Sequence, residues 1–82
     1  MKINAQRLLA DIETLSHFTE EATPGWTRRF PSSAYQESRQ WLRQRFENAG
    51  LKTHIDAAGN LHGRTAIAAL PPICAGSHTD TV

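Results

Sequence analysis

The chain has 82 residues, of which 39% are hydrophobic and 21% charged, which fits one small globular domain with a limited core. Nine basic and eight acidic residues give a net charge of +1, which argues against a nucleic-acid or anionic-membrane partner. The longest apolar run, 66–75, is broken by Pro71 and Pro72 and is too short to span a membrane. With no secretory signal and a single cysteine, Cys74, we expect a cytoplasmic protein.

The first predicted element is an amphipathic helix that begins after Asn4. Its apolar residues recur at three- and four-residue spacing: Ala5, Leu8, Leu9, Ile12, Leu15 and Phe18. Asn4 is the expected N-cap, because its side-chain oxygen can accept a hydrogen bond from a backbone N–H of the first turn. We expect the helix to end near Ala22, before the turn residues Thr23–Gly25, and a loop to run from Gly25 to Pro31.

The second helix is the most clearly marked element. Ser33 and Gln36 have the spacing of a capping box, and Gly50 supplies the left-handed residue that closes many helices. One face of this helix carries the residues that we expect to be buried: Tyr35, Ser38, Trp41, Leu42, Phe46 and Ala49. Charged and amide side chains occupy the other face, so the helix should pack on one side only.

After Gly50 the hydrophobic period changes from 3.6 to 2, which predicts a β-hairpin. Leu51–Ile55 alternates as a half-buried strand, Asp56–Asn60 forms the turn, and Leu61–Thr65 returns as the second strand. The next run, Ala66–Leu70, is equally compatible with a strand extension and a helical turn, and Pro71–Pro72 ends it. Ile73–Gly76 then has the composition of a short buried strand. Two helices followed by three strands predict an α/β fold.

A polar cluster follows the third predicted strand, and His78 and Asp80 are its chemically useful members. An open α/β sheet places its sites beyond the carboxyl ends of its strands. A neutral imidazole can bind a divalent ion there, and a nearby carboxylate can set the orientation and tautomer of that ring. The spacing is weak support when taken alone, because a His and an Asp two positions apart also occur often as a solvated surface pair.

The context of these two residues resembles a known family. Gly76-Ser77-His78-Thr79-Asp80-Thr81-Val82 looks like the first metal-binding motif of the M20 metallopeptidase superfamily, in the branch of amidases, hydantoinases and carbamoylases. That branch includes allantoate amidohydrolases and N-carbamoyl-L-amino-acid hydrolases. Further segments agree in the same order: Gly25-Trp26-Thr27-Arg28, Trp41-Leu42 through Ala49-Gly50-Leu51, Asp56 to Leu61, and Gly63-Arg64. The likeness spans nearly the whole chain.

The resemblance implies specific roles for the two site residues. His78 would be a metal ligand, and Asp80 the catalytic-site carboxylate that orients it. The implied cofactor is a divalent metal, zinc or manganese, with two ions in the full-length family. The implied reaction is hydrolysis of a C–N bond in a ureido, carbamoyl or amide substrate by metal-activated water.

The resemblance also implies where this chain belongs in such an enzyme. Residues 1–82 would be the N-terminal part of a three-layer α/β/α catalytic domain, truncated after the first metal motif. A catalytic metal usually needs at least three protein ligands, so we expect the chain to be inactive by itself.

Other residues with reactive side chains have simpler interpretations. We expect His17 to be a solvated helix residue, and His54 and His62 to be exposed residues facing one another across the hairpin, with a chance metal pair as the weaker alternative. Cys74 should be a small core residue. A packing role and a substrate-facing role are equally open for Trp26. The arginines at 28, 29, 39, 43 and 45 are diluted by glutamates and should form a solvated face.

Two other interpretations of the whole chain remain open at this stage. The chain could be a stand-alone α+β binding module in which the final motif is incidental. It could also self-associate, as a homodimer for example, through a surface that the rest of a larger domain would cover, since an uncovered strand edge tends to pair with a second copy.

Overall fold

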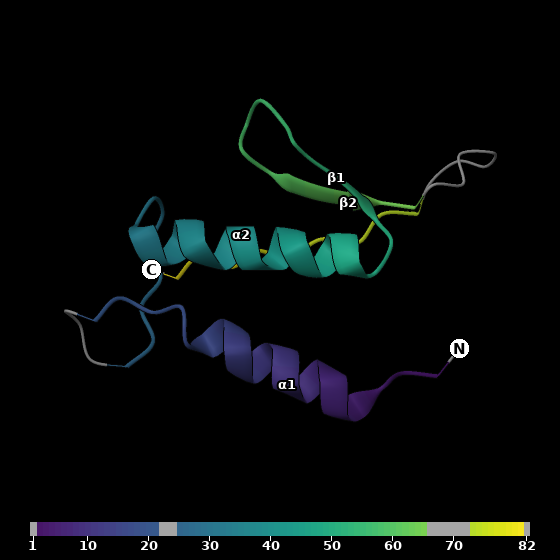
Figure 1. Cartoon of the computed structure of the whole chain (residues 1–82). Helices are drawn as coiled ribbons and strands as arrows, with labels where there is room; N and C mark the ends of the chain where they lie inside the picture. The colour runs from purple at the N-terminus through teal and green to yellow at the C-terminus, as the bar shows by residue number, and fades with distance from the viewer. Residues whose placement is uncertain (1, 22–24, 66–72, 82) are drawn as a thin grey trace. The chain divides into compact units, whose positions relative to one another are not determined.

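The computed structural model describes residues 2–21, 25–65 and 73–81. Its elements follow in the order α1 (Ala5–Ser16), α2 (Ser33–Asn48), β1 (Lys52–Ile55) and β2 (Leu61–Arg64), as Figure 1 shows. The chain divides into two units, Met1–Ser38 with Thr79–Val82, and Arg39–His78, so that α2 contributes to both. Two helices followed by a two-stranded sheet confirm the α/β class.

Several predicted features cannot be compared with the structure. Ala22, the turn at Thr23–Pro24, the ambiguous run Ala66–Leu70 with Pro71–Pro72, and Val82 lie outside the described residues. Within the described residues, no helix combines the length and the apolar character that crossing a membrane requires.

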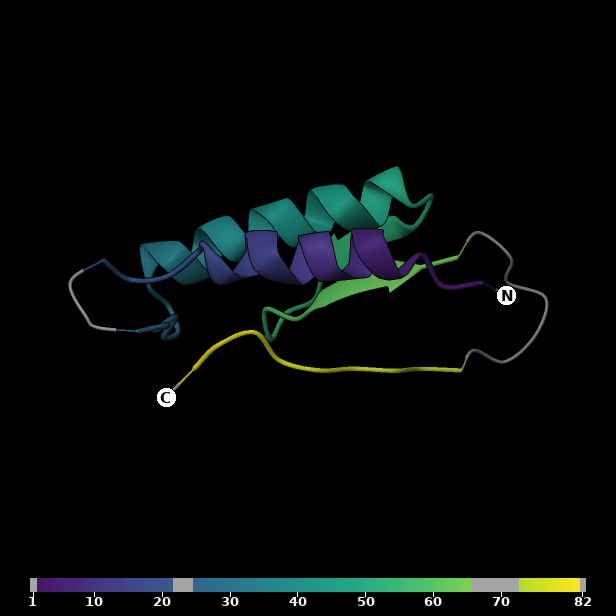
Figure 2. The same cartoon turned by 90° about the horizontal axis from the view of Figure 1, so that it is seen from below.

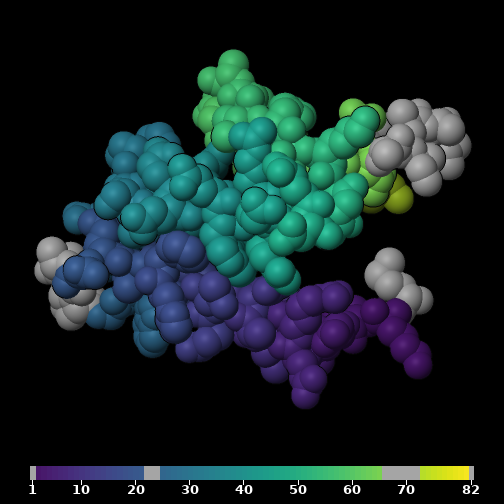
Figure 3. Space-filling model, in the orientation of Figure 1, coloured from purple at the N-terminus to yellow at the C-terminus, as the bar shows by residue number. Residues whose placement is uncertain are grey.

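Helix α1 begins as predicted and ends earlier than predicted. The Arg7 backbone N–H donates to Asn4 Oδ1 at 3.0 Å, which confirms Asn4 as the N-cap. The helix ends at Ser16: the N–H groups of His17 and Phe18 bond three residues back, to Thr14 and Leu15, and the Glu20 N–H donates to the Thr27 carbonyl instead of continuing the helical ladder. Helix α1 has no buried residue, and much of it, coloured purple in Figure 3, lies at the surface.

Helix α2 has a sharply defined cap at each end. The Tyr35 N–H donates to Ser32 Oγ at 3.2 Å, so Ser32 is the N-cap, and the predicted capping box starting at Ser33 is wrong by one residue. At the other end, Gly50 has φ +89° and the Leu51 N–H donates to the Phe46 carbonyl at 3.0 Å. This ending, with a left-handed glycine and a hydrogen bond from the residue after it, is a Schellman motif, and it confirms the role predicted for Gly50.

The buried side of α2 is narrower than its sequence pattern suggests. Among the described residues, only Ala34 and Ser38 are buried, at 5% and 0% exposure. Trp41 and Phe46 are half-buried rather than core, and Ala49 is exposed. A chain of this size has too little apolar volume to enclose large side chains on every side, so these two aromatic rings remain partly in solvent.

Strands β1 and β2 form the predicted antiparallel hairpin. The register pairs Lys52 with Arg64, Thr53 with Gly63, His54 with His62, and Ile55 with Leu61. Gly59 in the turn has φ +90°, which a residue with a Cβ rarely adopts. The sequence had placed each strand within one residue of its observed bounds.

The predicted third strand at Ile73–Gly76 is not formed. Residues 73–81 have no regular secondary structure, and Figure 2 shows them as an extended trace. Ile73 is 101% exposed and Cys74 is exposed, so the expectation of a buried run is also wrong. A strand exists only when its backbone groups bond to a neighbouring strand, and the hairpin of the described residues pairs only with itself.

Candidate functional site

The two predicted site residues lie in the irregular segment 73–81. His78 is exposed, whereas Asp80 is half-buried, as are Thr79 and Thr81 on either side of it. Within the part of the chain that the structure describes, no three His, Cys, Asp or Glu side chains gather into a set that could hold a metal ion. The structure therefore shows how the motif is held and leaves its metal role a prediction.

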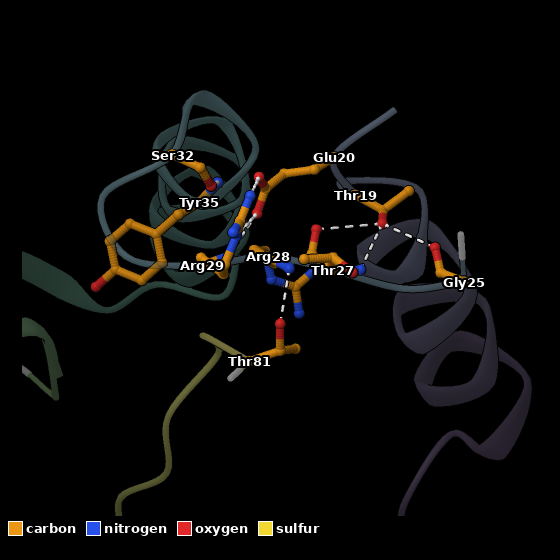
Figure 4. A network of polar contacts seen from close by, with 9 residues as sticks. All are labelled: Thr19, Glu20, Gly25, Thr27, Arg28, Arg29, Ser32, Tyr35 and Thr81. Carbon is orange, nitrogen blue, oxygen red and sulfur yellow. Dashed lines mark hydrogen bonds and ion pairs between the residues drawn. The ribbon is translucent and has the colours of Figure 1, made fainter. Parts of the chain in front are cut away.

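The side chain of Arg28 connects the motif to the first unit. Its Nε donates to the Thr79 carbonyl at 2.7 Å, and its Nη1 donates to the carbonyls of Leu15 at 2.8 Å and Phe18 at 3.0 Å. The backbone contributes two more bonds. The Arg28 N–H donates to Thr81 Oγ1 at 2.8 Å (Figure 4). The Thr81 N–H donates to the Arg28 carbonyl, also at 2.8 Å.

These bonds fix the backbone on both sides of Asp80. Thr79 is held by the guanidinium and Thr81 by the backbone of the same residue, Arg28. A guanidinium presents several N–H groups in a rigid plane, so one side chain can satisfy carbonyls from the end of α1 and from the motif together. The last carbonyls of a helix lack intrahelical partners, which makes the α1 terminus a natural acceptor.

A second set of bonds holds the loop that carries Arg28. Thr19 Oγ1 accepts from the Thr27 N–H at 2.8 Å and also lies 3.2 Å from the Thr27 carbonyl. The Glu20 N–H donates to that same carbonyl at 2.7 Å. Gly25, with φ +73°, turns the chain so that Thr27 can return alongside Thr19. Figure 4 shows these contacts converging next to Arg28.

Glu20 and Arg29 form a forked ion pair at the edge of this network. Arg29 Nη2 lies 2.7 Å from Glu20 Oε1, and Arg29 Nε lies 3.2 Å from Oε2. The Arg29 N–H also donates to Oε2, at 2.9 Å. Hydrogen bonds from the Arg29 side chain, and then from its backbone, lower the pKa of Glu20 to about 2. The carboxylate is therefore ionised at neutral pH and secures the loop that carries Arg28.

An open cavity of about 230 Å³ lies beside the Arg28 network. Apolar side chains from α1 and the following loop, including Ile12, Leu15 and Phe18, form much of its wall, and Arg28 and Thr81 also line it. Trp26 lines the same cavity while remaining 75% exposed. This position is compatible with both roles left open for Trp26.

The hairpin histidines form a cluster of their own. His54 and His62 are exposed and paired across the hairpin, as predicted, and their rings are stacked with centroids 4.4 Å apart and planes 7° apart. His62 Nε2 lies 2.8 Å from Asp56 Oδ2, and the same carboxylate accepts from the backbone N–H groups of Ala58 and Asn60. The bond to His62 and those from Asn60 lower the pKa of Asp56 well below its usual range.

The prediction for His17 is confirmed, and the prediction for Cys74 is wrong. His17 is exposed and lies 3.4 Å from Glu13 on the same helix, as expected of a solvated residue. Cys74 is exposed rather than a core residue, because the strand that would have buried it is not formed.

The arginines are not simply a solvated face, and this is where sequence reasoning missed the most. Arg39 donates to the Gly59 carbonyl, Arg43 Nε donates to Thr53 Oγ1 at 2.9 Å, and the Arg45 guanidinium lies 6.0 Å from the Trp41 ring centroid. Arginines 28 and 29 have the partners described above. The signal that could have identified Arg28 was its place in the segment Gly25–Arg28, which carries part of the family resemblance.

Comparison with known proteins supports the family resemblance, and each match covers only a part of the related protein. The chain is 37% identical to the allantoate amidohydrolase of Escherichia coli (strain K12) over 70 residues, which are 83% of this chain and 17% of that protein. It is 42% identical to allantoate deiminase 2 of Glycine max over 57 residues, 67% of this chain and 12% of that protein. It is 29% identical to the ureidoglycolate hydrolase of Arabidopsis thaliana across the whole chain, which covers 18% of that protein.

These similarities show a partial relationship. The chain spans only 12% to 18% of the length of these curated relatives. No protein-family model matches it, and no solved structure matches it significantly. The chain is thus related to the allantoate amidohydrolases over a part of their length, which confirms the resemblance at that level.

Proposed function

We propose that this chain is the N-terminal part of the catalytic domain of a metal-dependent amidohydrolase, in which His78 is a metal ligand and Asp80 orients it. The observation that carries the proposal is the similarity to allantoate amidohydrolase, which extends over most of this chain. The way that Arg28 holds Thr79 and Thr81 adds to it, because a ligand-bearing segment must be held in place to bind a metal with useful affinity.

The donor chemistry of the motif suits zinc or manganese. His78 offers an imidazole on an exposed side chain, and Asp80 offers a carboxylate that can accept the other ring N–H of a ligating histidine. At such sites a divalent ion supplies Lewis-acid polarisation of the scissile carbonyl and a lowered pKa for water. The remaining ligands, for one ion or two, would come from residues outside this chain, completing a three-layer α/β/α domain.

The substrate class follows from the chemistry named in the relatives. Allantoate and ureidoglycolate both contain a ureido group, whose C–N bonds are cleaved by hydrolysis. We therefore propose a small ureido, carbamoyl or amide compound as the substrate of the complete enzyme. The part played by the described residues is to supply and orient one ligand, while the groups that grip the substrate lie elsewhere. A single exposed cysteine, Cys74, fits a reducing compartment such as the cytoplasm.

A self-associating module is the second candidate, and one observation favours it. Leu8, Leu9 and Ile12 on α1 are 50%, 65% and 57% exposed, although they form an apolar stripe that normally packs against something. Light scattering across a range of protein concentrations separates the two functions. A monomer at all concentrations removes self-association, whereas a stable dimer that does not respond to metal favours it over the metal site.

Metal binding at His78 is the direct test of the proposed function. Zn²⁺ is added to the isotopically labelled 82-residue chain while the ring resonances of its four histidines are followed by NMR. We expect the His78 ring to respond at the lowest Zn²⁺ concentration and the His78→Ala variant to lose that response. His17→Ala, which removes an exposed histidine on α1, is the matched control. A His78 ring that responds no earlier than His17 would contradict the proposal.

A further inference from the structure

We propose that Arg28 is the positioning residue of the candidate site: it holds the segment 79–81 so that Asp80 can orient His78. This inference rests on the proposed function of His78 and Asp80. It goes beyond that function because Arg28 belongs to neither the metal motif nor the residues expected to contact substrate.

The Arg28 guanidinium bonds to three backbone carbonyls from separate parts of the chain. Three N–H···O bonds of 2.7 to 3.0 Å join its guanidinium to carbonyls at sequence separations of 10, 13 and 51 residues. Two of those carbonyls belong to the C-terminal end of α1 and the residues after it, and the third belongs to Thr79. The side chain is half-buried, so the bonds compete less with water than those of an exposed arginine would.

The backbone of Arg28 makes two further hydrogen bonds to the same segment. Its N–H and carbonyl pair with Thr81 Oγ1 and the Thr81 N–H, each at 2.8 Å. Asp80 therefore lies between two residues that are both tied to Arg28. Its carboxylate can move only as far as its own side-chain torsions allow, because the peptide units on each side are held.

Lysine cannot reproduce this arrangement. An ammonium group is a single point of donation on a flexible stem, whereas the guanidinium directs Nε and Nη1 to different carbonyls at once. The Arg28→Lys variant should keep the positive charge and lose the simultaneous hydrogen bonds to different carbonyls. Arg28→Met removes both, and comparing the two variants separates the effect of charge from that of bonding.

The first measurement is structural and does not involve metal. In the 82-residue chain, hydrogen exchange at the Thr81 N–H should accelerate about 10-fold in Arg28→Met and in Arg28→Lys. Arg7→Gln is the matched control, because it removes an exposed guanidinium from α1 and leaves the bond from the Arg7 backbone N–H to Asn4 in place. Unchanged exchange at Thr81 in both Arg28 variants would overturn the inference. Unaltered amide shifts in α2 and the hairpin show that a variant remains folded.

The second measurement distinguishes positioning from simple structural support. In Arg28→Lys, the Zn²⁺ concentration that half-saturates the His78 ring response should rise by up to about 10-fold. The responses of His54 and His62, which lie on the hairpin, should not change and serve as an internal reference. An altered Thr81 exchange with an unaltered His78 midpoint would overturn the positioning role. If the wild-type His78 ring does not respond to Zn²⁺, the proposed function fails and the positioning role fails with it, whatever Thr81 shows.

Discussion

Gly63 lies directly against the ring of Phe46. A Cβ on Gly63 would be 2.7 Å from Phe46 Cδ2, closer than such atoms approach without displacement, and in tight contact with Leu51 Cδ1 at 3.0 Å. Strand β2 can therefore pack on the end of α2 only because position 63 has no side chain. This contact joins the helix to the sheet, and both lie in the unit Arg39–His78.

Adding a methyl group at position 63 should destabilise the chain. We expect Gly63→Ala to lower the free energy of unfolding by about 1–3 kcal/mol, because Phe46 must move out of its present position. Urea unfolding followed by circular dichroism measures this. Gly76→Ala is the control, since a Cβ there would meet nothing within 4 Å, and it should change stability by less than about 0.5 kcal/mol. Equal effects of the two substitutions would contradict the packing described here.

The start of α2 provides a test of the corrected N-cap. Ser32→Ala removes the oxygen that accepts the Tyr35 N–H, and we expect it to cost about 1 kcal/mol of unfolding free energy. Ser33→Ala, one residue later, leaves that bond in place and should change stability by less than about 0.5 kcal/mol. Thermal unfolding of the two variants side by side decides between them. A larger loss in Ser33→Ala would restore the capping box expected from the sequence.

The Glu20–Arg29 pair predicts a specific dependence of stability on pH. Since the pKa of folded Glu20 is about 2, below the ordinary value of 4.5, its contribution is present above about pH 4.5. That contribution is lost as the pH falls from 4.5 towards 2, because the unfolded state then binds the proton first. Glu20→Gln should reduce the slope of the unfolding free energy against pH in this interval. Glu21→Gln, which neutralises the adjacent exposed carboxylate, should leave the Glu20 component intact, and identical profiles for both variants would refute the assignment.

The 82-residue chain should have no hydrolytic activity on its own. Its described residues bring together no three metal-binding side chains, and a catalytic divalent ion usually needs at least that many protein ligands. Ammonia and urea release from allantoate, and amino-acid release from an N-carbamoyl amino acid, are assayed with added Zn²⁺ or Mn²⁺. Turnover that survives in the His78→Ala variant indicates a contaminating enzyme. Turnover that requires His78 would show that this chain is catalytic by itself.

The elements that could be predicted from sequence are those whose signals are local. Helix α1 and the Asn4 cap, the Gly50 ending of α2 and the facing pair His54–His62 all depend on residues within a few positions of each other. One error in this class was the choice of Ser33 instead of Ser32, because adjacent serines give the same pattern and only the backbone decides which one caps.

The prediction of the candidate site used the sequence in a different way from the prediction of the helices and the hairpin. His78 and Asp80 were identified by resemblance, and their metal role stays a prediction. The bonds that hold their segment could not be predicted, because Thr79 and Arg28 are 51 residues apart and no local period links them. The charge pattern even suggested that Arg28 faced solvent, since periodicity reports which side of an element is apolar and says nothing of a guanidinium that bonds to backbone carbonyls.

The sequence by itself therefore determined the helices, the hairpin with its register, and the family relationship, because hydrophobic period, capping residues and motif order are written along the chain. The tertiary structure alone decided that Ile73–Gly76 is not a strand, that α1 stops at Ser16, and that Arg28 binds both sides of Asp80. The physical reason is the same in each case. A strand needs a neighbour with open backbone groups, a helix ends where other partners take its N–H groups, and a guanidinium binds whichever carbonyls the fold brings within reach.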